Sequence, residues 1–337
     1  MDKIVITGIG MASRFADSAE ELYNALKESK DMSGAVPMLD LGKKRGLAFT
    51  DSITKKLYGV YEKTMLDADL ADNDTDKDYT GIFLGNAQGS LDSIVNFEEK
   101  AIVEGYKSVL PANFINTVMN APAGQLAILS GIKGMNLTFS DGSSAAVSVL
   151  AYSADMLADK RIKRAVVGAI EDVSPLYESY LESYDAVPSG GICLLTAEPE
   201  EDASKRGAEI YAAWRGSAGA YYESPQTEHI YEVMNSAVAE SGLDKEDIDF
   251  VITSCGMGKI SEKEAEAVLK FGSPYVDVKK VTGEIYGAFG VFAAVAAITI
   301  MRHKMLPDGT PLEKGKYALI NSVGVDGYIT SFVIEGR

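Results

Sequence analysis

Residues 136–157 constrain the fold more than any other part of this chain. Residues 136–140 (NLTFS) alternate apolar and polar side chains as a short strand does, and residues 141–144 (DGSS) have the chemistry of a turn that starts a helix. Residues 145–157 are apolar on nearly every face of a helix, which predicts that this helix is buried. The N-terminus of such a helix favours an anion or a thiolate nucleophile, because free N–H groups and the helix dipole meet there. The turn holds no cysteine, and that absence directs the interpretation of the site.

The composition limits the class of protein. A chain of 337 residues, 46% of them hydrophobic, is long enough for two similar halves in one body. The net charge of −17 argues against nucleic acid and against an anionic membrane surface as partners. Cys193 and Cys255 have neither metal-ligand spacing nor the pattern of a disulfide framework, so we expect a reducing compartment and neither a metal nor a cofactor. The N-terminus resembles a strand rather than a signal peptide, and the longest apolar run, residues 291–301, is too short to span a bilayer; we expect a cytoplasmic protein.

The order of predicted elements indicates a duplicated α/β architecture. Strands and helices alternate along the chain, which predicts mostly parallel sheets covered by helices. Residues 8–10 (GIG) are expected to form a turn after the first strand, but they lack the third glycine of a nucleotide-binding loop. The charged segment 197–207 predicts a boundary between an N-terminal half, residues 1–200, and a C-terminal half, residues 201–337. Each half has one apolar helix near its middle, so we expect two buried helices between two sheets.

Several longer segments carry a family resemblance. They are the opening IVITGIGMASRFADSAEELYNALKESK, the segment NFINTVMNAPAGQLAILSGIKGMNLTFSDGSSAAVSVLAYSADML, and later RAVVGAIEDV, VTGEIYGAFG, LPDGTP and ALINSVGVDGYITSFVI. In this order they resemble the β-ketoacyl-acyl-carrier-protein synthases of the thiolase superfamily, over nearly the whole chain. The resemblance implies an α/β fold of the thiolase type, with five αβαβα layers made of two pseudo-duplicated halves.

The resemblance also identifies where a nucleophile would lie. In that family a cysteine at the N-terminus of the buried helix receives the acyl chain as a thioester, and two histidines assist decarboxylation and stabilise the developing negative charge. The cysteine position corresponds to Gly142, in a degenerate turn at residues 140–144. The only histidines of the chain, His229 and His303, lie in polar helical segments, and we expect both at the surface.

Both family histidine positions hold other residues. The first corresponds to Cys255, in a degenerate loop at residues 255–259, and the second to Glu284, in a degenerate loop at residues 283–290. Two charged family positions are retained, at Lys279 and Glu266. Because glycine cannot form a thioester and the imidazoles are missing, we do not expect ordinary condensation by this chain alone.

The replaced positions allow more than one interpretation. Asp141 could help to hold an anion, although a plain helix cap is the simpler interpretation. Cys255 is expected to fill space as a small buried thiol, or it could be a relocated nucleophile with Glu284 as its base. Glu284 could instead form an ion pair with Lys279 that closes an abandoned site. The family's late glycine-rich loop corresponds to residues 322–327 (SVGVDG).

The degenerate positions resemble those of chain-length factors from type II polyketide and aryl-polyene systems, which pair with an active ketosynthase. Residues 282–286 (TGEIY) match a Thr-Gly-x-x-Tyr loop of those factors, although the usual glutamine at the nucleophile position is absent here. The resemblance implies a heterodimer in which residues 136–140 form an edge strand at the interface. Candidate tunnel and interface residues are Phe114, Asn116, Met119 and Met257.

These features leave three hypotheses about function. The leading one is a noncatalytic ketosynthase-like subunit that shapes the acyl tunnel, with acyl carrier protein docking on the partner. The second is a divergent acyltransferase, decarboxylase or thioester hydrolase that uses Cys255 with Glu284 and Lys279. The third is an acyl-binding homodimer.

Overall fold

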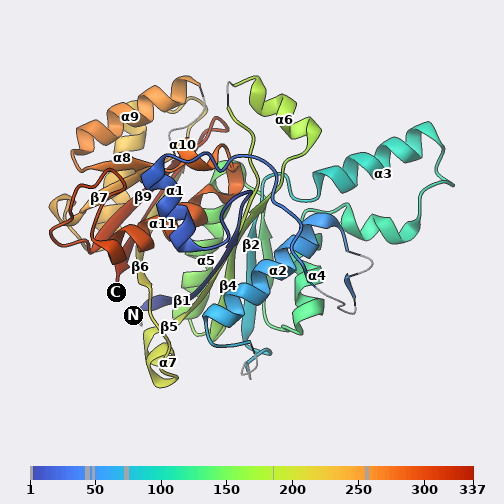
Figure 1. Cartoon of the computed structure of the whole chain (residues 1–337), viewed down its shortest axis with the longest axis horizontal. Helices are drawn as coiled ribbons and strands as arrows, with labels where there is room; N and C mark the ends of the chain where they lie inside the picture. The colour runs from blue at the N-terminus through green and yellow to red at the C-terminus, as the bar shows by residue number, and fades with distance from the viewer. Residues whose placement is uncertain (1–2, 42–45, 48–49, 72–75, 185, 255–257) are drawn as a thin grey trace.

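A single sheet runs through the whole molecule. The computed structural model describes residues 3–41, 46–47, 50–71, 76–184, 186–254 and 258–337. Ten strands in these residues lie in the order β3-β2-β4-β5-β1-β6-β10-β9-β7-β8 (Figure 1). The strands are β1 (Ile4–Ala12), β2 (Thr80–Gly85), β3 (Asn136–Phe139), β4 (Arg164–Glu171), β5 (Gly191–Pro199), β6 (Ala212–Tyr221), β7 (Phe250–Thr253), β8 (Tyr275–Asp277), β9 (Tyr317–Val323) and β10 (Tyr328–Gly336).

The strand order repeats between the two halves of the chain. Counted from the centre of the sheet, the first half reads β1-β5-β4-β2-β3 and the second reads β6-β10-β9-β7-β8. Where the two half-sheets meet, β1 and β6 pair antiparallel at Val5 with Ala213 and at Ile6 with Ala212, and an isolated bridge also links Pro188 to Glu284. The repeated order supports an internal duplication; the boundary between residues 200 and 201 stays a prediction, and the predicted linker there forms the end of β5 and the short helix α7 (Glu200–Lys205).

The expectation of mostly parallel sheets is wrong. The outer pairs β2–β3, β2–β4, β7–β8 and β7–β9 are parallel. The pairs toward the centre, β4–β5, β1–β5, β1–β6, β6–β10 and β9–β10, are antiparallel. Sequence periodicity does not report strand direction, because a buried strand is apolar on both faces in either arrangement.

Helices cover the sheet in layers. The longer ones are α1 (Ala19–Glu28), α2 (Ser52–Asp67), α3 (Leu91–Val103), α4 (Ala121–Ser130), α5 (Ala145–Ala158), α6 (Pro175–Glu182), α8 (Thr227–Glu240), α9 (Lys259–Phe271) and α11 (Phe289–His303). One apolar cluster joins α5 and α11 to strands of both halves, a second joins α2 and α4 to the first half, and a third joins α8 and α9 to the second half.

Alternating side chains of the strands make these layers possible. In β2, Phe83 belongs to the central cluster, whereas Ile82 and Leu84 belong to the cluster with α2 and α4. In β7, Ile252 faces the central cluster and Val251 the cluster with α8 and α9. Since successive side chains of a strand point to opposite faces, each half-sheet lies between two helical layers, and the result is the five-layer αβαβα arrangement.

The glycines at residues 8–10 belong to β1 rather than to the expected turn. A Cβ atom at Gly10 would lie 2.7 Å from the backbone nitrogen of Thr64 in α2, and one at Gly8 would lie 2.6 Å from the Cβ of Ala68. The glycines therefore allow α2 to pack directly against β1, and this close approach explains a pattern that the sequence alone suggested was a turn.

The apolar run around α11 is a core helix. Among the described residues, one stretch is long and apolar enough to cross a membrane by length and composition, Tyr286–His303, with a mean hydropathy of 1.3. It extends beyond the run expected from the sequence, but 89% of it is buried inside the protein.

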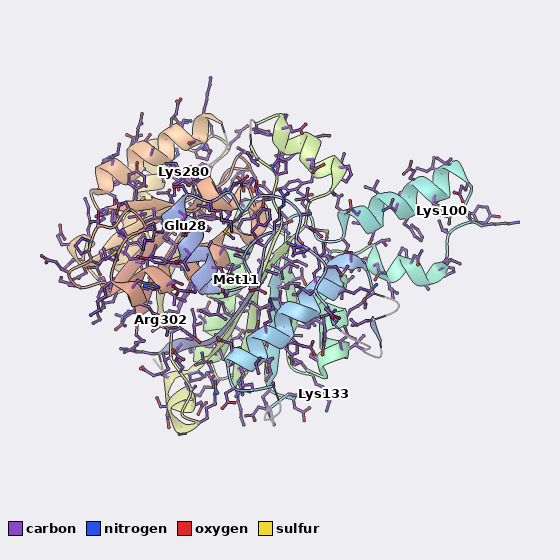
Figure 2. The ribbon with its side chains drawn as sticks, viewed as in Figure 1. Met11, Glu28, Lys100, Lys133, Lys280 and Arg302 are labelled. Atoms are coloured by element: carbon purple, nitrogen blue, oxygen red, sulfur yellow. The ribbon has the colours of Figure 1, made fainter. Side chains whose placement is uncertain are left out.

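An arm projects from this body. Helix α3 and the short helix η2 (Pro111–Asn116) extend away from the sheet, and Lys100 marks the outer part of this arm (Figures 1 and 2). No residue of α3 or η2 is buried. Strand β3 forms one edge of the sheet, and its four residues are half-buried or exposed.

Candidate functional site

The turn before α5 excludes a side chain at the expected nucleophile position. Gly142 opens the short helix η3 (Gly142–Ser144) with a φ of +65°, a conformation that residues with a Cβ atom rarely adopt. A Cβ atom on Gly142 would overlap the carboxylate of Asp326 and lie 3.5 Å from the Oη of Tyr286. Backbone conformation and neighbouring atoms thus both select glycine.

The carboxylate of Asp326 occupies the space where the nucleophile would lie. Its Oδ2 accepts hydrogen bonds from the backbone N–H of Ser143 and from the Oη of Tyr286, both at 2.8 Å. Its Oδ1 accepts one from the Oγ of Ser143 at 2.9 Å and one from the N–H of Tyr328 at 3.3 Å. The positive end of the α5 dipole adds to these bonds, so the carboxylate is a stable occupant of the turn.

Tyrosines close the site on the side of α6. Tyr286 is 7% exposed and Tyr177 is 1% exposed, and their ring centroids lie 6.2 Å apart. Burial, followed by the charge of Asp326, raises the pKa of Tyr286 well above its usual value, so its phenol stays protonated and donates to the carboxylate. Burial also raises the pKa of Tyr180, in α6, to about 12. The phenols of Tyr286 and Tyr180 therefore stay protonated at neutral pH and do not act as bases.

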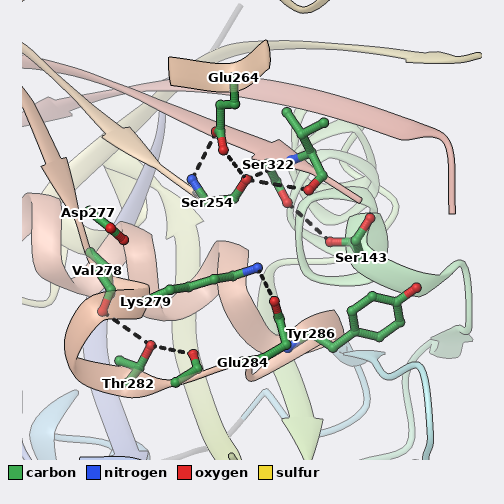
Figure 3. Close-up of polar contacts among 12 residues, drawn as sticks. Ser143, Ser254, Glu264, Asp277, Val278, Lys279, Thr282, Glu284, Tyr286 and Ser322 are labelled. Atoms are coloured by element: carbon green, nitrogen blue, oxygen red, sulfur yellow. Dashed lines mark hydrogen bonds and ion pairs between the residues drawn. The ribbon is translucent and has the colours of Figure 1, made fainter. Parts of the chain in front are cut away.

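The residue at the position of the family's second histidine, Glu284, forms an ion pair with Lys279. The Oε2 of Glu284 lies 2.7 Å from the Nζ of Lys279, and its Oε1 accepts a hydrogen bond of 2.8 Å from the N–H of Tyr286 (Figure 3). The side chains of Glu284 and Lys279 are only 4% and 12% exposed. Both carboxylate oxygens are engaged, so Glu284 is held as a structural anion rather than as a free base.

The residue that corresponds to the family's first histidine, Cys255, is not among the described residues. Cys255 and Met257 lie outside the described residues, so their predicted roles stay predictions. The preceding residue, Ser254, comes directly after β7 and is buried.

The buried glutamate near this loop is Glu264, not Glu266. Glu264 is fully buried, and it accepts hydrogen bonds from the N–H and Oγ of Ser254 (Figure 3). It also accepts one from the Nδ2 of Asn321. Glu266 instead accepts a hydrogen bond from Thr227 at the surface. The two glutamates are two residues apart on α9 and so point to different faces of the helix, which sequence matching alone could not resolve.

The buried carboxylate of Glu171 binds backbone N–H groups of two segments beside the site. Glu171, at the end of β4, is fully buried and accepts hydrogen bonds from the backbone N–H groups of Ala87, Gln88 and Gly287. Burial raises the pKa of Glu171 to about 8; these three hydrogen bonds oppose the rise and the charge of Glu284 adds to it.

The candidate tunnel residues lie on the arm and at its root. Phe114 is 59% exposed on η2 and packs against Phe97 of α3, with Asn116 at the end of the same helix. Met119 lies nearer the turn, since its carbonyl oxygen accepts a hydrogen bond from the Nδ2 of Asn86, whose Oδ1 accepts one from Ser140. The structure thus connects Met119 to the degenerate turn and leaves Phe114 facing solvent.

The predicted cap at Asp141 is not formed. Its Oδ2 accepts a hydrogen bond from the Oγ of Ser148, one helical turn inside α5, rather than from the first backbone N–H groups. Its Oδ1 is buried and has no hydrogen-bond partner among the described residues.

Both histidines lie away from the turn, near the surface. His229 is half-buried and stacks on Tyr222, with ring centroids 3.8 Å apart. His303 stacks on Tyr23 at 4.2 Å and lies 3.0 Å from the carboxylate of Glu20. Each ring therefore has an aromatic contact that the sequence did not indicate.

The described site lacks the groups that condensation needs. Gly142 offers no nucleophile, Glu284 is locked by Lys279, and Cys193 is fully buried with its pKa raised by that burial. No group of three or more His, Cys, Asp or Glu side chains within the described ranges could hold a metal ion. The described site instead binds the carboxylate of Asp326 through hydrogen bonds from Ser143 and Tyr286.

The fold has two half-sheets around two buried helices, and one of these helices begins at a degenerate nucleophile turn. Together these features define a thiolase-like protein of the condensing-enzyme type. Sequence profiles of the "Beta-ketoacyl synthase, N-terminal domain" and the "Beta-ketoacyl synthase, C-terminal domain" match residues 37–186 and 208–313. The chain belongs to the β-ketoacyl synthase family.

Curated relatives and solved structures agree with this assignment. The chain is 24% identical to 3-oxoacyl-[acyl-carrier-protein] synthase 2 of Vibrio cholerae over 408 aligned positions, covering 99% of each. It is 23% identical to 3-oxoacyl-[acyl-carrier-protein] synthase 1 of Haemophilus influenzae, covering 93% of this chain and 89% of the relative. The fold is similar to the ishigamide ketosynthase/chain length factor, with a TM-score of 0.88 and 17% identity over 100% of this chain and 99% of the other. The fold is also similar to that of a β-ketoacyl synthase from Burkholderia phymatum, with a TM-score of 0.86 and 17% sequence identity over 100% of both chains.

Proposed function

We propose that this chain is a noncatalytic subunit that pairs with an active β-ketoacyl synthase in fatty-acid or polyketide assembly and shapes its acyl tunnel. The observation that carries the noncatalytic part is the carboxylate of Asp326 in the space of the side chain at residue 142. An acyl thioester cannot form on glycine, and the internal carboxylate excludes an acyl group from the turn. The relatives named above are 3-oxoacyl-[acyl-carrier-protein] synthases, and we propose that this chain lacks their activity because Gly142 cannot form the thioester.

The pairing role rests on the arm and on the edge strand. Strand β3 is a four-residue edge strand that pairs with β2 on one side and with no described strand on the other, and an open sheet edge is a template for pairing with another chain. The arm and its base carry large apolar side chains that are more than a third exposed: Val95, Ile102, Val103, Tyr106, Leu110, Phe114, Ile115 and Val118. So many exposed apolar side chains on one projection are typical of a protein–protein interface.

Carboxylates follow the aromatic contact between α5 and β3 along the exposed side of α5. On the exposed side of α5, Tyr152 packs against Phe139 of β3, with ring centroids 5.6 Å apart, and Asp155 and Asp159 follow on the same side. Burial first, and then the charges of Asp159 and Glu240, raise the pKa of Asp155, and none of the three carboxylates has an ion-pair partner in the described chain. Asp155 and Glu240 line one surface depression together with Lys3 and Arg215, so cations of this chain lie near these carboxylates.

The remaining parts of the proposal follow from this pairing. Carrier protein is acidic as a class and this chain has a net charge of −17, so we place carrier docking on the synthase partner. Phe114 and Ile115, exposed on η2, are the side chains that we expect to reach the acyl tunnel of the partner. We also propose a cytoplasmic location and the two halves 1–200 and 201–337.

Coexpression tests the proposal. The tagged chain is produced with each ketosynthase of its own genome, and native mass spectrometry measures the stoichiometry of what copurifies. We expect a one-to-one complex whose product differs in length from that of the ketosynthase alone, and an Ile102→Glu variant that no longer forms it. Leu269→Glu, at a comparably exposed position on α9, is the matched control and should leave the complex intact. Absence of any stable complex would overturn the pairing role.

A further inference from the structure

Three of the four hydrogen bonds to Asp326 come from outside the loop that carries it, and the fourth comes from the N–H of Tyr328. Ser143 lies at the start of α5 and is 4% exposed, and Tyr286 lies in η5 (Tyr286–Ala288) and is 7% exposed. A backbone N–H, a serine hydroxyl and a phenol therefore converge on one point from rigid, buried elements (Figure 3 shows Ser143 and Tyr286 on the same side of the site). Such a set matches the two oxygens of a carboxylate.

The loop, in turn, is held by its own backbone. Asp326 lies in the turn between β9 and β10, where the N–H of Gly324 donates to the carbonyl oxygen of Tyr328 at 3.0 Å and the N–H of Gly327 donates to that of Gly324 at 3.2 Å. Gly327 has a φ of +91°, as a tight turn requires. Removing the carboxylate leaves these bonds in place, so the turn should persist while its acceptor is lost.

We propose that the degenerate nucleophile turn is a carboxylate receptor, occupied by the chain's own Asp326. When the Asp326 side chain is shortened, a small external carboxylate such as acetate or malonate binds the same donors at Ser143 and Tyr286. In the native chain Asp326 acts as an internal competitor that excludes such ligands. This inference does not depend on a partner subunit.

Binding of acetate to the Asp326→Ala variant tests the inference. Titration calorimetry and thermal melting should show saturable binding of acetate with a rise in Tm, and no such effect on the native chain. Acetamide and chloride at equal concentration control for shape and for ionic strength. A second variant, Asp326→Ala with Tyr286→Phe, should bind acetate about tenfold more weakly, since it lacks one hydrogen bond to a charged acceptor.

Each outcome decides the question. Acetate binding that is absent from the native chain and weakened by Tyr286→Phe supports the receptor. Folded Asp326→Ala protein that gains no carboxylate-specific stabilisation overturns it, and so does binding that Tyr286→Phe leaves unchanged. If Asp326→Ala does not fold in plain buffer, refolding with and without acetate gives the same test: rescue by acetate but not by acetamide or chloride supports the receptor, and equal failure in all three contradicts it.

Discussion

A Cβ atom at residue 142 and the carboxylate of Asp326 cannot occupy the turn together, so their substitutions should be strongly coupled. Gly142→Ala forces the carboxylate out and breaks its hydrogen bonds to Ser143 and Tyr286. Three such bonds at about 1 kcal/mol each give about 3 kcal/mol. The left-handed backbone, at a φ of +65°, adds about 1–2 kcal/mol for a residue other than glycine. We expect Gly142→Ala to lower the free energy of unfolding by about 4–5 kcal/mol.

A double-mutant cycle measured by urea denaturation isolates the coupling. In an Asp326→Ala background the carboxylate is already gone, so Gly142→Ala should cost only the backbone part, about 1–2 kcal/mol. Gly242→Ala is the matched control, because Gly242 has a φ of +71° and a Cβ atom there would meet no described atom within 4 Å. The steric reasoning would be refuted if Gly142→Ala lowered the free energy of unfolding equally in both backgrounds and by the same amount as Gly242→Ala.

Two further substitutions test the buried charges. Glu171 has a folded-state pKa of about 8 against 4.5 for an unperturbed glutamate; its neutral form stabilises the fold fully below the unfolded value, and this contribution is lost as the pH rises through 8. Up to about 5 kcal/mol of unfolding free energy should be lost over that range, and Glu171→Gln should flatten the dependence in urea titrations at several pH values. Lys279→Met leaves Glu284 buried without its cation and should cost about 3–5 kcal/mol, whereas the double variant with Glu284→Met should recover part of that loss in the same assay. If Glu171→Gln leaves the pH dependence of the unfolding free energy unchanged, the assignment of Glu171 is wrong. If the losses of Lys279→Met and Glu284→Met simply add in the double variant, the assignment of the ion pair is wrong.

Local patterns were enough to predict the framework of the fold. The buried helices α5 and α11 follow from apolar runs, and the duplication follows from their placement in each half. Strand direction, and the extension of β1 through Gly8 and Gly10, could not be predicted, because both depend on packing against distant elements.

The site was predictable only where it depends on residue identity. The missing nucleophile at Gly142 could be inferred from the sequence, and the pairing of Lys279 with Glu284 was one of two interpretations that the sequence left open. The occupant of the turn could not, because Asp326 lies 183 residues from Ser143 and only the fold joins them. The one available signal was an acidic residue in the late glycine-rich loop. Glu264 was missed for a related reason, since burial and not sequence spacing distinguishes it from Glu266.

The catalytic competence of the purified chain tests the central claim most directly. The chain alone is incubated with acyl- and malonyl-loaded carrier protein, and mass spectrometry follows both the protein and the products. We predict no acyl adduct on any residue and no β-ketoacyl product, with or without prolonged incubation. Sustained turnover, or an acyl group bound covalently to the chain, would contradict the account.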